Sequence, residues 1–101
     1  MKELLFPSET ITTVKKAYLV IRSINHKLRQ QILQLLHDNQ RLTVTELYVK
    51  LRLEQSVASQ HLAILRRNGI VTTERDGKYI HYSVNYERLN EVKELAGRLN
   101  Y

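Results

Sequence analysis

One side of residues 55–67 carries side chains whose chemistry suits base edges and phosphates. Serine, glutamine and arginine recur there at the three- and four-residue steps of a helical face, with the small Ala63 among them. The candidate binding residues are Gln55, Ser56, Ser59, Gln60 and Arg67. A glutamine can bond adenine through two atoms, serine reaches bases or phosphates, and arginine binds phosphate. Because most polar helix faces are merely solvated, this interpretation depends on the elements around the helix.

The order of those elements is that of a winged helix-turn-helix. Thr43–Leu51 is predicted to form a short helix, Leu53–Glu54 a tight turn and Gln55–Asn68 a longer helix. Ile70–Val84 is predicted to form a β-hairpin with Asp76–Gly77 at its tip. The predicted fold class is therefore mainly α with a small β-hairpin, and such a module places its second helix in the major groove of DNA.

Two cations stand at the tip of the predicted hairpin. With Asp76–Gly77 as a two-residue loop, the strands pair Val71 with Tyr82, Thr73 with Ile80, and Arg75 with Lys78. Like charges directly opposed on a hairpin are mildly destabilising, so Arg75 and Lys78 are best explained if a phosphate binds beside them. Two screened charges at an exposed tip are the alternative. On the same face, Val71, Ile80 and Tyr82 are expected to pack on the core.

The segments before the turn carry their own signals. Asn25 is expected to cap the helix that follows it, with Arg29 of that helix turned outward. Arg41–Thr43 is expected to form a short strand on the hairpin, and Thr43 with Glu46 has the spacing of a capping box. These elements would hold the longer helix by its apolar face, which carries Ala58, Leu62 and Leu65.

The first and last predicted helices each carry a narrow apolar stripe at three- and four-residue spacing. The stripe residues are Ile11, Val14, Tyr18 and Ile21 in the first helix, and Leu89, Val92, Ala96 and Leu99 in the last. The stripes can pack on each other, but a chain of 101 residues cannot easily cover both. A symmetric dimer would cover them and would present two recognition helices to a palindromic DNA site.

Composition favours a phosphate-rich partner and excludes several classes of protein. The net charge is +6, and no acidic residue lies between Thr10 and His37. The chain has no cysteine, which excludes disulfides, thiolate metal sites and sulfur-based redox sensing. It has no signal peptide and no apolar stretch long enough to span a membrane. We therefore expect one domain, residues 1–101, in a cytoplasmic protein.

Catalytic and metal chemistry are not indicated. No two of the four histidines have i,i+4 spacing on one helix, so no closed metal site and no cofactor is predicted. The sequence has no glycine-rich phosphate loop, glycine-flanked serine or plausible carboxylate pair, so an enzyme is not expected. An atypical metal site built from His26, His37 or the N-terminal arm is kept as an alternative.

Most of the chain follows a familiar pattern, carried by Leu53–Leu62, Leu65–Val71, the upstream Asn25–Leu36 and the hairpin segment Asp76–Val84. In these stretches it resembles the ArsR/SmtB family of bacterial repressors. The resemblance implies a homodimer formed by the first and last helices, which binds an operator and releases it when an inducer binds. It also implies base and phosphate contacts by Gln55, Ser56, Ser59 and Gln60, and wing contacts by Arg75 and Lys78.

The chain departs from that family where its members bind metal. Thr43 and Thr45 stand where many members have cysteine ligands, and Asn85–Tyr101 has no histidine, although other members bind metal in their last helices. The resemblance therefore supports DNA binding but not metal sensing, and it leaves the effector unknown. We predict a homodimeric, sequence-specific DNA-binding repressor of an inverted-repeat operator. A dimeric partner-binding module and a metal-responsive repressor with a histidine site are the alternatives.

Overall fold

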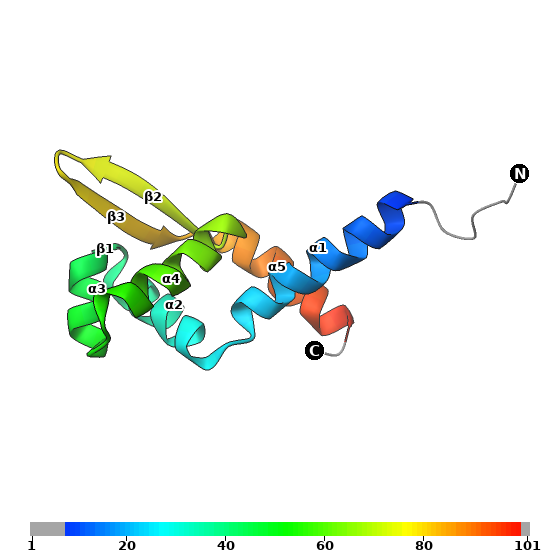
Figure 1. Cartoon of the computed structure of the whole chain (residues 1–101), viewed down its shortest axis with the longest axis horizontal. Helices are drawn as coiled ribbons and strands as arrows, with labels where there is room; N and C mark the ends of the chain where they lie inside the picture. Colours follow the sequence, from blue (N-terminus) through cyan, green and yellow to red (C-terminus); the bar gives the residue numbers. More distant parts are fainter. Residues whose placement is uncertain (1–7, 100–101) are drawn as a thin grey trace, which may run out of the picture.

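The computed structural model describes the backbone of residues 8–99 and the side chains of residues 14–99. This part of the chain forms helices and a small sheet of short strands (Figure 1). They are α1 (Ser8–Ile24), α2 (Lys27–Asn39), β1 (Leu42–Thr43), α3 (Val44–Leu51), α4 (Gln55–Arg67), β2 (Val71–Asp76), β3 (Tyr79–Val84) and α5 (Tyr86–Arg98). The predicted order of short helix, turn, longer helix and hairpin is confirmed as α3, α4, β2 and β3, and β1 is the short strand expected before α3.

Local signals fix the ends of the helix-turn-helix. The hydroxyl of Thr43 accepts the backbone N–H of Glu46 at 3.2 Å, and the Glu46 carboxylate accepts the N–H of Thr43 at 3.0 Å. This is the predicted capping box at the start of α3. Arg52 ends α3 in a left-handed conformation with φ of 55°, and Gly69 follows α4 with φ of 75°. Arg52–Glu54 is therefore all that separates α3 from α4.

One hydrophobic core receives side chains from every helix and strand in the described part of the chain. Its buried members are Ile21, Ile32, Leu33, Leu36, Leu42, Leu47, Ala58, Leu62, Leu65, Ile70, Val71, Val84 and Val92. Ala58, Leu62 and Leu65 lie on one face of α4, as their spacing predicts. The opposite face of α4 is therefore turned away from the core.

The hairpin register differs from the prediction by two residues. Asp76 faces Tyr79 and Arg75 faces Ile80, so Gly77–Lys78 forms the two-residue loop. Gly77 has φ of 62°, and a positive φ at the first loop position alone is the requirement of a type II′ turn. The prediction that Arg75 opposes Lys78 is therefore wrong, because glycine takes the first position of the loop and not the second.

A shift of two residues leaves each side chain on its predicted face of the hairpin. Val71 is buried and Tyr82 packs against the core, but Ile80 is 46% exposed, so the expectation that it packs there is wrong. β1 pairs with β3 on the edge opposite β2 and places Leu42 against Tyr82. Since β1 has only two residues, the outer half of the hairpin extends beyond it as a wing (Figure 1).

The start of α2 differs from the prediction at two residues. His26, and not Asn25, caps the helix, because its Nδ1 accepts a backbone N–H at 3.1 Å. Arg29 is buried and not turned outward, since its guanidinium donates to the carbonyls of Ser23 at 2.7 Å and Arg22 at 3.3 Å. Those carbonyls belong to the last turn of α1, where a helix provides no partner of its own. Arg29 therefore ties α2 to the end of α1.

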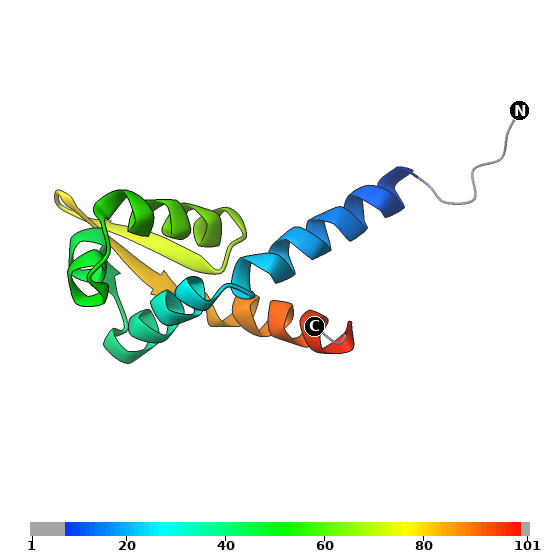
Figure 2. The same ribbon diagram turned by 60° about the horizontal axis from the view of Figure 1, so that its bottom comes forward.

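The molecule is elongated, 57 × 28 × 24 Å along its principal axes, because α1 extends away from the other elements (Figures 1 and 2). α5 contacts α1, and the remaining helices gather around the sheet. No helix in the described part of the chain is both long and apolar enough to cross a bilayer.

The two apolar stripes of α1 and α5 divide into an inner and an outer part. The inner residues Ile21 and Val92 are buried in the core of this one chain, and Leu89 and Ala96 pack against it. These four therefore support the fold of the single chain, because α1 and α5 contact each other there. The outer residues Val14 (63%), Tyr18 and Leu99 (54%) are exposed. The side chain of Ile11 lies outside the described residues.

Candidate nucleic-acid interface

The polar side of α4 is exposed along its whole length. The exposed set comprises Gln55, Ser56, Ser59, Gln60 and Arg67. Within residues 14–99, these side chains form no hydrogen bond or ion pair with another part of the chain. Burial of Ala58, Leu62 and Leu65 holds the helix in this rotation. Free donors and acceptors on a rigid helix are what the recognition of bases and phosphates requires.

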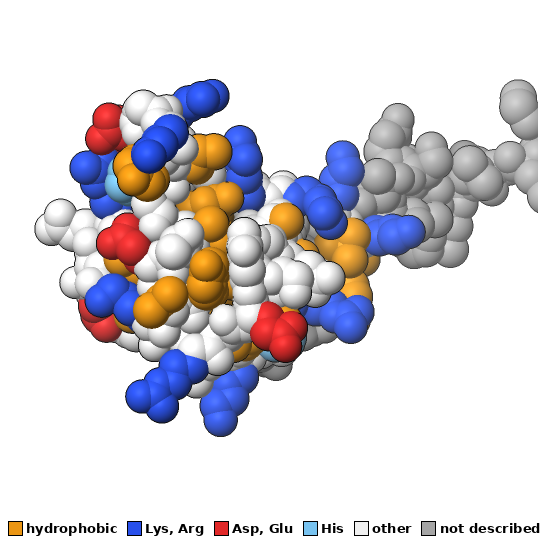
Figure 3. All heavy atoms as spheres, turned by 60° about the vertical axis from the view of Figure 1, so that its left-hand side comes forward, with side chains coloured by type: hydrophobic (Ala, Val, Ile, Leu, Met, Phe, Trp, Pro, Cys, Tyr) orange, Lys and Arg blue, Asp and Glu red, His pale blue; other side chains and the backbone are white. Residues whose placement is uncertain are grey.

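The wing carries its two cations at the tip, where Figure 3 shows blue side chains projecting into solvent. The Nε of Arg75 donates to the carbonyl of Gly77 at 3.1 Å, which steadies the guanidinium beside the turn. The Lys78 ammonium lies 5.4 Å from the centre of the Tyr79 ring. Arg75 and Lys78 therefore share the tip, although they are not paired across the strands.

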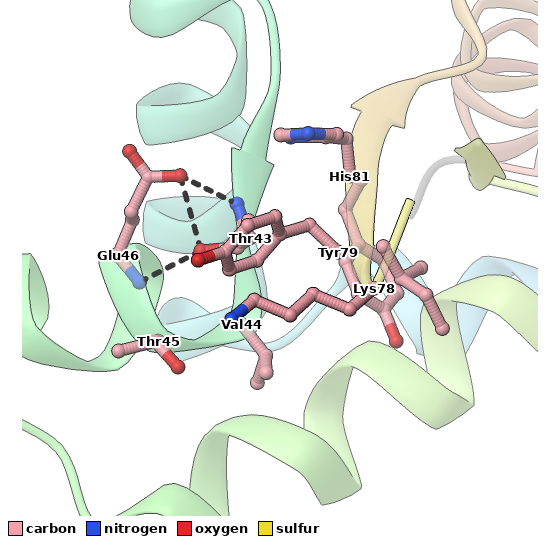
Figure 4. Close-up of a pocket in the computed structure, with 9 residues that line it drawn as sticks. Thr43, Val44, Thr45, Glu46, Lys78, Tyr79 and His81 are labelled. Carbon is pink, nitrogen blue, oxygen red and sulfur yellow. Dashed lines mark hydrogen bonds between the residues drawn. The ribbon is translucent and has the colours of Figure 1, made fainter. Parts of the chain in front are cut away.

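A groove of about 630 Å³ separates the start of α3 from the outer half of β3 (Figure 4). Its walls are Thr43, Val44, Thr45 and Glu46 on one side, and Lys78, Tyr79, Ile80, His81 and Tyr82 on the other. Lys78 runs back along the groove toward α3 (Figure 4). β1 pairs with only His81 and Tyr82, so Tyr79 and Ile80 have no neighbouring strand on the side of the groove. The groove joins the helix-turn-helix and the wing into one surface.

The carboxylate in this groove is already engaged. Thr43 donates its backbone N–H and its hydroxyl to Glu46, each at 3.0 Å. These bonds, aided by the nearby His81 and Lys50, hold the pKa of Glu46 below its ordinary value. Glu46 therefore serves as the cap of α3, and Lys78 supplies the positive charge that lines the groove.

A histidine pair that the sequence did not reveal lies where α2 meets α4. The rings of His26 and His61 are 4.9 Å apart, and the Nδ1 of His61 is buried without a partner in the described part of the chain. Burial, followed by the charges of His26 and Arg29, lowers the pKa of His61. The two histidines are distant in sequence and meet only through helix packing, so no local spacing could have indicated them.

The described residues offer little to a metal ion. No group of three or more His, Asp or Glu side chains within them is arranged to hold one, and the chain has no cysteine. His37, a member of the alternative metal site, instead places its Nδ1 2.8 Å from the Tyr86 hydroxyl.

Comparison with known proteins agrees with this geometry. Residues 26–73 match the model of the arsR family of bacterial regulatory proteins. Over 84 residues, the chain is 39% identical to the transcriptional activator HlyU of Vibrio cholerae. The aligned part covers 83% of this chain and 77% of HlyU.

Solved structures give the same result. Reduced HlyU from Vibrio cholerae has a TM-score of 0.65 at 37% identity, covering 92% of this chain and 97% of that one. The transcriptional repressor PagR of Bacillus anthracis has a TM-score of 0.67 at 28% identity, and the match covers 84% of this chain and 98% of the PagR chain. The fold is thus the predicted winged helix-turn-helix, and the relatives are regulators of transcription and not enzymes. This chain belongs to the ArsR family of DNA-binding transcriptional regulators.

Proposed function

We propose that this regulator acts as a homodimer that binds an inverted-repeat operator and represses transcription from it. The observation that carries the proposal is the exposed polar face of α4, whose side chains have no hydrogen-bond partner within residues 14–99. The wing of the same chain adds two exposed cations at its tip. In this account Gln55, Ser56, Ser59 and Gln60 contact bases and nearby phosphates, while Arg67, Arg75 and Lys78 contact phosphates. Phosphate neutralisation supplies much of the affinity, so binding falls steeply with salt.

The outer part of α1 supports the dimer. Val14 and Tyr18 are large hydrophobic side chains left exposed on a helix that extends away from the core. Alongside α1 and α5 runs a groove of about 430 Å³ whose lining includes Ala17, Val20 and Leu95. A second copy related by a two-fold axis would cover these apolar atoms and place two α4 helices on one side of the dimer.

We expect repression because a dimer bound to the operator is enough to block transcription. A dimer seated on an operator within a promoter blocks polymerase without needing any further surface. HlyU is named an activator and PagR a repressor, so members of similar sequence are assigned opposite signs. A reporter gene placed behind the selected operator shows whether the regulator represses or activates transcription. We expect lower expression of the reporter when the regulator is present.

We further propose that the regulator senses neither metal nor thiol oxidation, because it has no cysteine and its described residues offer no cluster of ligands. Zinc titration followed by calorimetry tests this. Stoichiometric zinc binding that His26→Gln or His37→Gln abolishes would favour the metal-responsive alternative instead.

The direct test is selection of bound sequences from random duplex DNA, at moderate salt and in the presence of a chelator. We expect an inverted repeat whose half-sites lie roughly 10 bp apart, which is one helical turn of DNA. Sequence-blind binding that disappears with salt would contradict the proposal. That result would favour the alternative in which the polar face of α4 binds a protein partner.

A further inference from the structure

Three arginines converge on a groove of about 330 Å³ between α1 and the C-terminal half of α4. Arg22 comes from the last turn of α1, Arg29 from α2 and Arg67 from the end of α4. Leu19 and Ile64 form the apolar part of the wall, and no Asp or Glu side chain lines the groove. Like charges that share a groove repel one another, and a bound anion would relieve that repulsion.

The innermost of the three guanidinium groups is held rigidly. Arg29 is only 8% exposed, and its Nε and one terminal nitrogen donate to the carbonyls of Ser23 and Arg22. The charge of Arg22 adds to the cost of burying that of Arg29. The carbonyls satisfy the hydrogen bonds of Arg29 but carry no full negative charge, so the repulsion between the two arginines is left uncompensated.

The outermost guanidinium group belongs to the recognition helix. Arg67 lies on the same face of α4 as Ser56, Ser59 and Gln60, and it makes no ion pair within the described residues. The groove therefore opens at the C-terminal end of the face that we propose reads DNA. A planar guanidinium binds the oxygens of phosphate in pairs, and guanidinium groups on several sides of a groove suit a tetrahedral oxyanion.

We propose that this groove is an oxyanion-binding site that takes a phosphate group. The bound phosphate contacts Arg22 and Arg67, with Arg29 supplying fixed positive charge behind them. It ties the end of α1, a helix of the proposed dimer, to the end of the recognition helix. The phosphate belongs either to the DNA backbone or to a free phosphorylated molecule.

The first arm of the test uses the free protein and inorganic phosphate. The melting temperature is followed as phosphate replaces chloride at constant ionic strength. We expect a saturable rise in the wild type that is reduced in Arg22→Gln and Arg67→Gln. Arg41→Gln is the matched control, because Arg41 is exposed and lies outside the groove, and it should respond like the wild type. Arg22→Lys keeps the charge and should retain part of the rise, which separates lost binding from damaged folding.

The second arm uses operator DNA. If the phosphate is that of the backbone, Arg22→Gln lowers the slope of log affinity against log salt by about one, whereas Arg41→Gln does not. A lowered slope in Arg22→Gln supports the site and identifies the DNA backbone as the source of its phosphate. A phosphate-dependent rise that both variants reduce, with an unchanged slope, identifies a free phosphorylated molecule. Wild-type behaviour of Arg22→Gln and Arg67→Gln in the first arm, together with an unchanged slope for Arg22→Gln in the second, would overturn the proposal. The first arm needs no DNA, so it tests the phosphate site even if the protein proves not to bind an operator.

Discussion

Among single residues, Gln60 is the side chain that we expect to read a base. Its amide is exposed on the outer face of α4 and has no hydrogen-bond partner within residues 14–99. Gln60→Ala should relax the base preference at one position in each half-site, at a cost of about 1–3 kcal/mol for the preferred base. Repeating the sequence selection with the variant measures this. Gln31→Ala, at an exposed glutamine of α2, is the control, and a Gln60→Ala profile identical to that of the wild type would exclude Gln60 from readout.

Arg75 is expected to behave differently, because a phosphate contact carries no sequence information. Arg75→Ala should weaken binding to operator and to unrelated DNA by a similar factor and should reduce the salt slope by about one. Fluorescence anisotropy over a range of salt concentrations measures both effects. A loss confined to the operator would mean that Arg75 reads sequence.

His61 makes stability depend on pH. Its pKa is lowered in the folded chain, so the unfolded chain binds the proton more readily. The free energy of unfolding should therefore be highest above the ordinary pKa of 6.5 and should fall as the pH decreases from there through the folded value. Denaturant unfolding between about pH 7.5 and pH 5 should show this decline and a shallower one in His61→Gln. His37→Gln, at an exposed histidine, should decline as the wild type does; equal slopes in all three proteins would rule out His61 as the cause.

At the scale of helices and strands, the end of α4 depends on a glycine. Gly69 has φ of 75°, and an alanine Cβ there would lie 3.5 Å from the Arg88 side chain, an ordinary contact. Conformational strain alone should make Gly69→Ala about 1–2 kcal/mol less stable. Gly97 lies in α5 with no atom within 4 Å of an added Cβ, so Gly97→Ala should be more stable by about 0.5–1 kcal/mol. Thermal unfolding compares them, and a change of the same sign in both would contradict this explanation.

Elements with local signals could be predicted from the sequence, and contacts between elements could not. Thr43 and Glu46 form their capping box within one turn, and the period of Ala58, Leu62 and Leu65 determined which side of α4 is exposed. The hairpin register depends on which loop position takes a positive φ; the Asp76–Gly77 pair predicted Gly77 at the second position, and the structure places it at the first. Arg29 looked like a surface residue because the carbonyls that it binds belong to another helix.

The same limit applies to the candidate site. Exposure of the five α4 residues followed from helical periodicity alone. The groove between α3 and the wing and the groove of the three arginines each combine segments that are far apart in sequence. Sequence patterns report the face of one element, so a site formed between elements became visible only in the folded chain.

For the molecule as a whole, the outer part of α1 is expected to drive assembly. Val14 and Val49 are similarly exposed valines, at 63% and 61%, on α1 and α3 respectively. A buried unpaired carboxylate is costly at an interface, so Val14→Glu should shift the protein toward monomer, whereas Val49→Glu should not. Sedimentation velocity over a range of protein concentrations distinguishes the two variants. A monomeric wild-type protein would show that the outer part of α1 does not form a dimer interface.

Whether two copies read one operator together is tested by comparing a duplex that contains the selected inverted repeat with a duplex in which one half-site is scrambled. The stoichiometry and affinity of each complex are measured by sedimentation and anisotropy. We expect two protomers on the intact repeat and a much weaker complex on the single half-site. One protomer on each duplex, with equal affinity, would contradict this expectation.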